Sequence, residues 1–116
     1  YDMGSLYLDP NEWRIIAPTG PGPQPYCTGG ELALWTSSDE GVTWLKARDI
    51  TQDSTHNHTY ARRPLDAHRD LYAFWADGNA LGPSESRLYF ANRDGSEVWR
   101  LPERMSGDTE KPLRVE

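Results

Sequence analysis

Apolar and polar residues alternate in short runs along the chain, and this alternation predicts β-strands. No window shows the period of apolar residues that is typical of a helix. Clusters of turn-forming residues, among them DPNE, SDEG, LDAHRD and NRDGSE, separate the runs. The pattern therefore predicts an all-β chain with strands at 4–8, 12–18, 31–36, 43–50, 60–64, 71–76, 86–91 and 97–102.

The predicted strands form two sets of four that resemble each other. ELALWTSSDEGVTWLKARDI parallels SRLYFANRDGSEVWRLPERM, and EWRIIAPTG parallels DLYAFWADG. Leu34 matches Tyr89 and Asp39 matches Asp94, in each case 55 positions apart. A repeat of this length with four strands per unit is typical of a β-propeller blade. The alternative is an antiparallel sandwich in which two hairpins happen to look alike.

The repeat divides the chain into a first blade at 1–51, a second blade at 52–105, and a tail or the start of a further strand at 106–116. Propellers typically close with about 4–8 blades. Two blades are too few for a ring, so we expect the fold to need the remaining blades of a longer protein or self-association.

Composition and charge narrow the choice of partner. The formal net charge is −6, which argues against a surface for nucleic acid or an anionic membrane. No apolar run is long enough to span a membrane. Five Trp and six Tyr suit an aromatic-rich all-β protein.

The segment 37–44 has the pattern Ser-x-Asp-x-Gly-x-Thr-Trp. Gly41 permits the positive φ of a tight turn, and the Asp39 carboxylate can accept hydrogen bonds from backbone N–H groups of that turn. Ser37 and Thr43 offer further hydroxyls, and Trp44 can pack over the hairpin. We therefore interpret the segment as a structural turn between two strands rather than as the site of a catalytic Asp.

This pattern resembles the Asp-box, or BNR repeat, of sialidase-like propellers. The second copy, at 92–99, keeps only Asp94 and Trp99 of the pattern. Longer stretches, such as NHTYARRPLDAHRDLYAFWADG, resemble propeller proteins of the BNR-4 type. These are large seven-bladed bacterial proteins of polysaccharide degradation, related to ulvan lyases and to enzymes that act on rhamnose–glucuronate linkages. The resemblance implies an oligo- or polysaccharide partner and a secreted or periplasmic location, with no cofactor and no metal ligands assigned.

In such a blade the long loops lie at the end opposite the Asp-box turn, so 18–30, 51–59 and 77–86 should share one face. Function commonly lies on loops that a rigid scaffold holds in place. We therefore take Gln24, Tyr26, Glu85 and Arg87 as candidate substrate-binding residues. The alternative is that these segments are plain connectors.

The most chemically rich segment is TQDSTHNHTYARRP. Alternation along a strand would place His58, Tyr60 and Arg62 on one side and Arg63 on the other. An arginine can neutralise the carboxylate of a uronic acid, while His or Tyr transfers the protons of a β-elimination. We take His58, Tyr60 and Arg62 as candidate catalytic residues and Arg63 as substrate-binding. His56 and His58 also have metal-ligand spacing, but no third ligand is evident.

The candidate residues and the resemblance together suggest three functions, in order of preference. The first is a lyase that acts on an acidic, uronate-containing extracellular polysaccharide by β-elimination. The second is a glycoside hydrolase of the same architecture. The third is a non-catalytic carbohydrate-binding or structural protein, in which Tyr26, Trp75 and Trp99 contact sugar or pack between blades.

Overall fold

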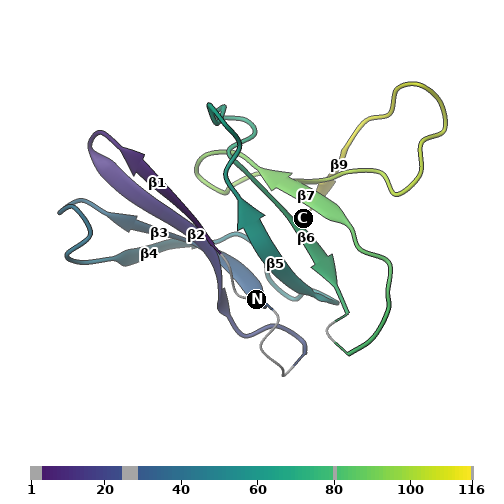
Figure 1. The fold of residues 1–116 in the computed structure, drawn as a ribbon, viewed down its shortest axis with the longest axis horizontal. Helices are drawn as coiled ribbons and strands as arrows, with labels where there is room; N and C mark the ends of the chain where they lie inside the picture. The colour runs from purple at the N-terminus through teal and green to yellow at the C-terminus, as the bar shows by residue number, and fades with distance from the viewer. Residues whose placement is uncertain (1–3, 25–28, 80, 116) are drawn as a thin grey trace.

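The computed structural model describes residues 4–24, 29–79 and 81–115. Within these residues it contains strands and no helix (Figure 1). The nine strands are β1 (Ser5–Asp9), β2 (Glu12–Gly20), β3 (Glu31–Ser37), β4 (Leu45–Asp49), β5 (Asn57–Arg62), β6 (Ala73–Gly78), β7 (Leu88–Ala91), β8 (Val98–Arg100) and β9 (Leu113–Val115). The predicted all-β class is confirmed.

The strands form two antiparallel sheets in simple chain order. The first sheet has the order β1-β2-β3-β4 and the second has the order β5-β6-β7-β8-β9. β9 pairs with β8, with Val115 opposite Val98, so the segment after residue 105 supplies a fifth strand. The second half therefore differs from the predicted set of four strands. The sheets do not close into a ring, and they diverge from each other in Figure 1.

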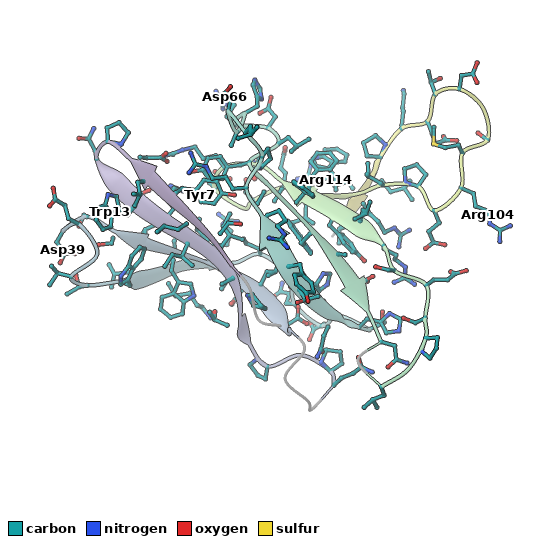
Figure 2. The ribbon with its side chains drawn as sticks, in the orientation of Figure 1. Tyr7, Trp13, Asp39, Asp66, Arg104 and Arg114 are labelled. Carbon is teal, nitrogen blue, oxygen red and sulfur yellow. The ribbon has the colours of Figure 1, made fainter. Side chains whose placement is uncertain are left out.

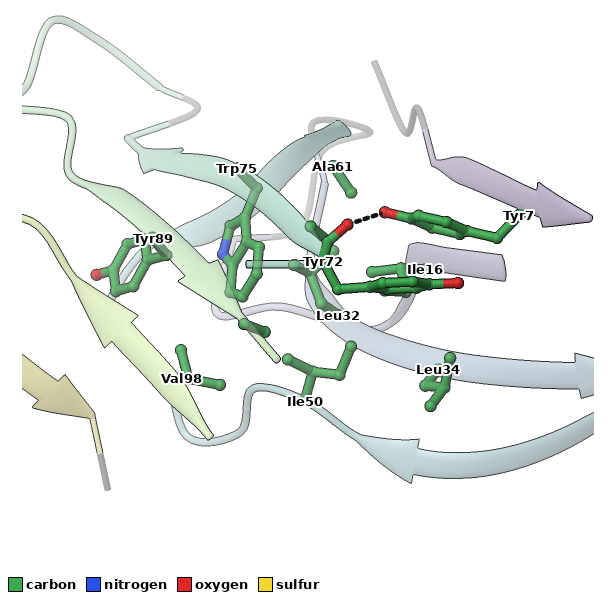
Figure 3. Packing of buried hydrophobic residues seen from close by; sticks show 12 residues of the cluster. Tyr7, Ile16, Leu32, Leu34, Ile50, Ala61, Tyr72, Trp75, Tyr89 and Val98 are labelled. Atoms are coloured by element: carbon green, nitrogen blue, oxygen red, sulfur yellow. Dashed lines mark hydrogen bonds between the residues drawn. The ribbon is translucent and has the colours of Figure 1, made fainter. Parts of the chain in front are cut away.

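A single apolar core lies between the two sheets (Figure 3). Tyr7 of the first sheet stacks on Tyr72, with ring centroids 4.1 Å apart. The Tyr7 hydroxyl donates a hydrogen bond to the Tyr72 carbonyl at 2.6 Å. Burial raises the pKa of Tyr7 to about 12, so this donor keeps its proton. The core residues are Tyr7, Ile16, Leu32, Leu34, Ile50, Ala61, Tyr72, Ala73, Trp75, Tyr89, Ala91 and Val98.

The two sheets contact each other through faces that are not equivalent. When an L-peptide strand runs upward and is viewed from the side to which a side chain points, the N–H and C=O of that residue point to the right. Leu32 on β3 and Ala91 on β7 both belong to the core between the sheets. The Leu32 carbonyl accepts the N–H of Ile50, which follows β4, whereas the Ala91 carbonyl accepts the N–H of Tyr72, which precedes β6. Seen from the core, β4 is thus to the right of β3, while β8 is to the left of β7.

This arrangement changes the meaning of the sequence repeat. A rotation that carries β1–β4 onto β5–β8 would carry the packed face of the first sheet onto the free face of the second. Leu34 and Tyr89, which match at a spacing of 55, are nevertheless both in the core. The spacing therefore relates the two hairpins in sequence but does not relate the directions of their side chains.

Candidate functional site

The turn at 37–44 is held by its own side chains. The Asp39 carboxylate accepts bonds from the Thr43 backbone N–H at 2.9 Å, the Thr43 hydroxyl at 2.6 Å and the Ser37 hydroxyl at 2.8 Å. The Ser37 hydroxyl accepts the N–H of Gly41, and the indole N–H of Trp44 donates to the Gly41 carbonyl. The Thr43 bonds, followed by the Ser37 bond, lower the pKa of Asp39 to about 2. The three side-chain hydrogen bonds described for Asp39 all lie within the turn.

The turn at 92–99 closes in a different way. Asp94 accepts from the N–H and the hydroxyl of Ser96, and Asn92 accepts from the N–H of Glu97. Gly95 takes the positive φ of 70° here, where Gly41 has 86° in the first turn. Trp99 stacks on Phe90, with ring centroids 6.4 Å apart. The two turns thus share an Asp and a Gly but not a hydrogen-bond pattern.

The three long loops meet at the opposite end of the sheets, as the sequence predicts. The Gln24 side chain donates to Asn79 at 2.5 Å, and the backbone N–H of Gln24 donates to the Asn57 side chain at 3.1 Å. Gly30 forms a two-bond bridge with His58. Glu85 is exposed on the third loop. The predicted substrate-binding residue Tyr26 lies outside the described residues.

His58 is buried, with 4% of its surface exposed, and both ring nitrogens are engaged. The indole N–H of Trp75 donates to Nδ1 at 2.9 Å, and Nε2 is 2.9 Å from the Ser54 hydroxyl. Because indole can only donate, Nδ1 must accept, so the neutral ring carries its proton on Nε2. Burial, opposed in part by Asp77 and Glu31, lowers the pKa of His58.

A chain of bonds continues from His58 to a carboxylate. The Ser54 hydroxyl donates to Glu31 at 2.9 Å, and the Ser54 backbone N–H donates to the same carboxylate at 2.8 Å. The Thr51 hydroxyl is a further donor to Glu31. The direction of donation therefore runs from Trp75 through His58 and Ser54 to Glu31. The sequence pattern did not assign Glu31 and Trp75 to this group, because their partners Ser54 and His58 are 23 and 17 residues away along the chain. Ser54 is only four residues from His58, but its place in the network depends on Glu31.

A pocket of about 520 Å³ lies between the sheets next to His58. Asp77 and Tyr89 line it from the second sheet, and the Tyr89 hydroxyl donates to Asp77 at 2.8 Å. Burial raises the pKa of Tyr89. The charged residues that line the pocket are Arg48, Asp49, Asp53, Asp77 and Arg114. Three carboxylates against two guanidinium groups do not favour an acidic ligand in this pocket.

The Arg87 guanidinium forms ion pairs with two carboxylates of its own chain. Its guanidinium is 3.0 Å from Glu103 and 3.6 Å from Asp77, and its backbone N–H donates to Asp77. This candidate substrate-binding residue is thus paired in the structure.

The expected grouping of His58, Tyr60 and Arg62 on one side of a strand is wrong. β5 begins at Asn57, earlier than predicted, and its pairing with β6 shifts register between Thr59 and Arg62. Tyr60 sits in this bulge with a φ of 57°. His58 pairs with Asp77 on the packed face, whereas Arg62 is exposed and pairs with Phe74 on the free face. Four residues of strand also separate His58 from Arg62 by about 13 Å.

The shift leaves two arginine–tyrosine pairs at the end of β5. The Arg62 guanidinium lies over the Tyr60 ring at 5.6 Å, and that of Arg63 lies over the Tyr7 ring at 5.4 Å. Both arginines are exposed. Within 4–24, 29–79 and 81–115, neither forms an ion pair.

The same end of the core holds two further arginines that do have acidic partners. Arg14 pairs with Glu12, and Arg93 pairs with Asp9 at 3.0 Å. Both guanidinium groups lie over the Tyr72 ring, at 5.7 and 5.9 Å. Arg62 and Arg63 thus differ from their neighbours in having aromatic contacts without a carboxylate.

In the part of the chain that the structure describes, no group of three or more His, Cys, Asp and Glu side chains is placed to hold a metal ion. These residues also contain no helix of the length and apolarity that a membrane crossing requires. Comparison of the chain with protein-family models, curated proteins and solved structures finds no match in any of the three.

Proposed function

We propose that the chain supplies two blades of a β-propeller that binds an acidic, uronate-containing polysaccharide. The blade arrangement is supported by the simple order of each sheet and by the packing of non-equivalent faces. Successive blades of a propeller are related by rotation, so each packs one face on the opposite face of the next. The remaining blades come from a longer protein or from other copies.

The observation that carries the proposed ligand is the pair of exposed arginines at 62–63. Each lies over a tyrosine ring and lacks a carboxylate partner among the described residues. A guanidinium group binds a carboxylate through two parallel hydrogen bonds, and the tyrosine ring beneath each guanidinium holds it by a cation–π contact. β5 is an edge strand, and propellers arrange their first strands around the central channel. A polymer along this edge can meet both cations.

The reaction we propose for the assembled protein is β-elimination. Arg62 neutralises the uronate carboxylate, which makes the proton on the adjacent carbon more acidic and stabilises the enediolate-like charge. Tyr60, which contacts Arg62, is the candidate base and takes that proton as its phenolate. The electron pair then forms a C=C bond, the glycosidic C–O bond breaks, and the leaving oxygen takes the proton from the Tyr60 hydroxyl, which returns Tyr60 to the phenolate. His58 holds the loop at 51–55 through Ser54 and does not act on the sugar.

A non-catalytic binding role is the second candidate. This role is favoured because both ring nitrogens of His58 already form hydrogen bonds inside the chain. Within the predicted catalytic set, only Tyr60 remains beside Arg62 as a group that can transfer a proton. Binding a polymeric sugar outside the cytoplasm requires secretion or export to the periplasm, so that location belongs to the proposal.

The test incubates the protein, in its complete reading frame, with glucuronate-containing polysaccharides. A rise in ultraviolet absorbance from an unsaturated uronate, lost in Tyr60→Phe and in Arg62→Gln, supports elimination. New reducing ends without absorbance would replace the lyase by a hydrolase. Retention of the polysaccharide without either product would leave the binding role. Arg104→Gln is the control, because Arg104 is an exposed arginine on a distant loop (Figure 2).

A further inference from the structure

Each sheet has a second face, opposite the shared core, on which some apolar side chains are exposed. On the first sheet, Leu6 and Leu8 point to this face and are 49% and 57% exposed. On the second sheet, Phe74 and Leu88 point to the free face and are 42% and 50% exposed. Large apolar side chains exposed together on the face of a sheet make that face a candidate interaction site.

The free faces repeat the chemistry of the packed ones. In the core, the first sheet presents the cross-strand pair Ile16–Leu34, and the second presents Trp75–Tyr89. The free face of the first sheet presents Ile15 opposite Trp35, whereas that of the second presents Phe74 opposite Phe90. Large apolar pairs on β2–β3 and on β6–β7 therefore occupy all four faces.

The handedness of the sheets decides which free faces match. The two faces of a sheet differ in whether the next strand along the chain lies to the right or to the left. Inside the chain, the packed face of the first sheet is the one from which β4 lies to the right of β3, whereas the packed face of the second is the one from which β8 lies to the left of β7. The free face of the second sheet is consequently of the same kind as the packed face of the first. By the same relation, the free face of the first sheet is of the same kind as the packed face of the second. The two free faces thus form the same combination as the interface already present in the core.

We propose that copies of this chain associate head to tail, the free face of the second sheet of one copy packing on the free face of the first sheet of the next. This inference rests on the blade arrangement proposed above, and the occupant is a second copy of the chain. Arg62 is opposite Phe74 on the edge strand β5, so it lies at the inner rim of this contact, beside the central channel. The contact joins different surfaces, so it is heterologous and is satisfied at every subunit only in a closed ring. Because a ring takes about 4–8 blades, about two to four copies would close it.

The test measures the mass of the wild-type chain and of two variants by analytical ultracentrifugation over a wide concentration range. Leu8→Arg places a charge on the free face of the first sheet, and Phe74→Arg places one on the free face of the second. Val42→Arg is the matched control, because Val42 is 80% exposed in the turn at 37–44, outside the strands of both sheets. Circular dichroism verifies that each variant is folded, and Leu6→Lys or Leu88→Lys replaces an unfolded one on the same face.

We expect a closed oligomer for the wild type and for Val42→Arg, and monomers of 13.2 kDa for each face variant alone. An equimolar mixture of Leu8→Arg and Phe74→Arg should give a one-to-one dimer, since one intact face of each kind remains. Dimers of either face variant alone would overturn the head-to-tail contact. A monomeric wild type, or aggregates that both variants leave intact, would also overturn the inference. The experiment contains no sugar, so a result that overturns the head-to-tail contact would leave the proposed binding of an acidic polysaccharide untouched.

Discussion

At the scale of single residues, His58 shows how burial turns a chemically versatile side chain into a structural one. Its Nδ1 accepts from Trp75, and its Nε2–H donates toward Ser54, so protonation of Nδ1 would set two donors against each other. The sequence offered His58 as a proton-transfer group because HNHTY places it near Tyr and Arg. Of the two residues that engage it, Ser54 is nearby, but Trp75 is 17 residues away and lies outside the local pattern.

The first prediction concerns the pH dependence of stability through His58. The pKa of His58 is lowered in the folded chain, so the unfolded chain binds more protons on this group. Its contribution to stability is complete above the unfolded pKa of about 6.5 and is lost as the pH falls through the folded pKa. Thermal unfolding of His58→Gln should lack this loss. His68→Gln, in an exposed turn, should behave as wild type, and equal pH profiles for all three proteins would contradict the account.

A second prediction concerns Asp39. The Thr43 bonds lower the pKa of Asp39 to about 2, so its contribution to the turn is present above the unfolded pKa of about 3.9. That contribution should disappear as the pH falls from about 4 to about 2. NMR titration of the Asp39 carboxyl checks the value. An Asp39 that titrates at the unfolded value of about 3.9 would show that the turn bonds are absent in solution.

At the scale of elements, the strands and turns were largely predictable because alternation and turn chemistry are local. β1, β2, β3, β6 and β7 all overlap the predicted ranges closely. The bulge at Tyr60 was not predictable, since the left-handed φ of a tyrosine has no sequence signal and costs about 1–3 kcal/mol. Because of this bulge, His58 and Arg62 lie on opposite faces of the sheet, and the predicted catalytic set is not brought together. β9 was predicted only as one of two possibilities for 106–116, a tail or the start of a further strand, because residues 113–115 carry too short an alternation to decide.

The third prediction tests the first turn as an element. Gly41 has a φ of 86°, and a Cβ there would lie 2.8 Å from a ring carbon of Trp13. Gly41→Ala should therefore lower the free energy of unfolding by about 1–3 kcal/mol. Gly107→Ala is the matched control, because a Cβ at Gly107 meets nothing within 4 Å and should change stability little. Chemical denaturation gives both values, and equal losses would mean that the turn conformation does not depend on glycine.

At the scale of the whole molecule, the two sheets share one core and should behave as one unit. Leu34 of β3 belongs to the same buried cluster as Trp75 and Tyr89 of the second sheet. The fourth prediction is that Leu34→Ala lowers the free energy of unfolding by about 2–5 kcal/mol. Hydrogen exchange should then show lower protection in β6 and β7 as well as in β3. A loss confined to the first sheet would mean that the sheets unfold independently.

The pairing of the two halves was predictable only in outline. The repeat indicated two similar sheets, and two sheets are present. It could not indicate which faces pack, because a one-residue change of register turns every side chain to the other face of a strand. The convergence of the three long loops followed from topology alone and is present. Which arginines lack acidic partners depends on contacts between distant segments, such as Arg93 with Asp9.

The measurement that most directly tests the central claim is a calorimetric titration of the chain with a glucuronate-containing oligosaccharide and with a neutral oligosaccharide of equal length. The account predicts binding of the acidic sugar that weakens with salt, and loss of that binding in the Arg62→Gln, Arg63→Gln double variant. The Arg104→Gln variant should bind as wild type. Equal binding of both sugars, or binding that the double variant retains, would contradict the claim that the arginines at 62–63 recognise an acidic sugar.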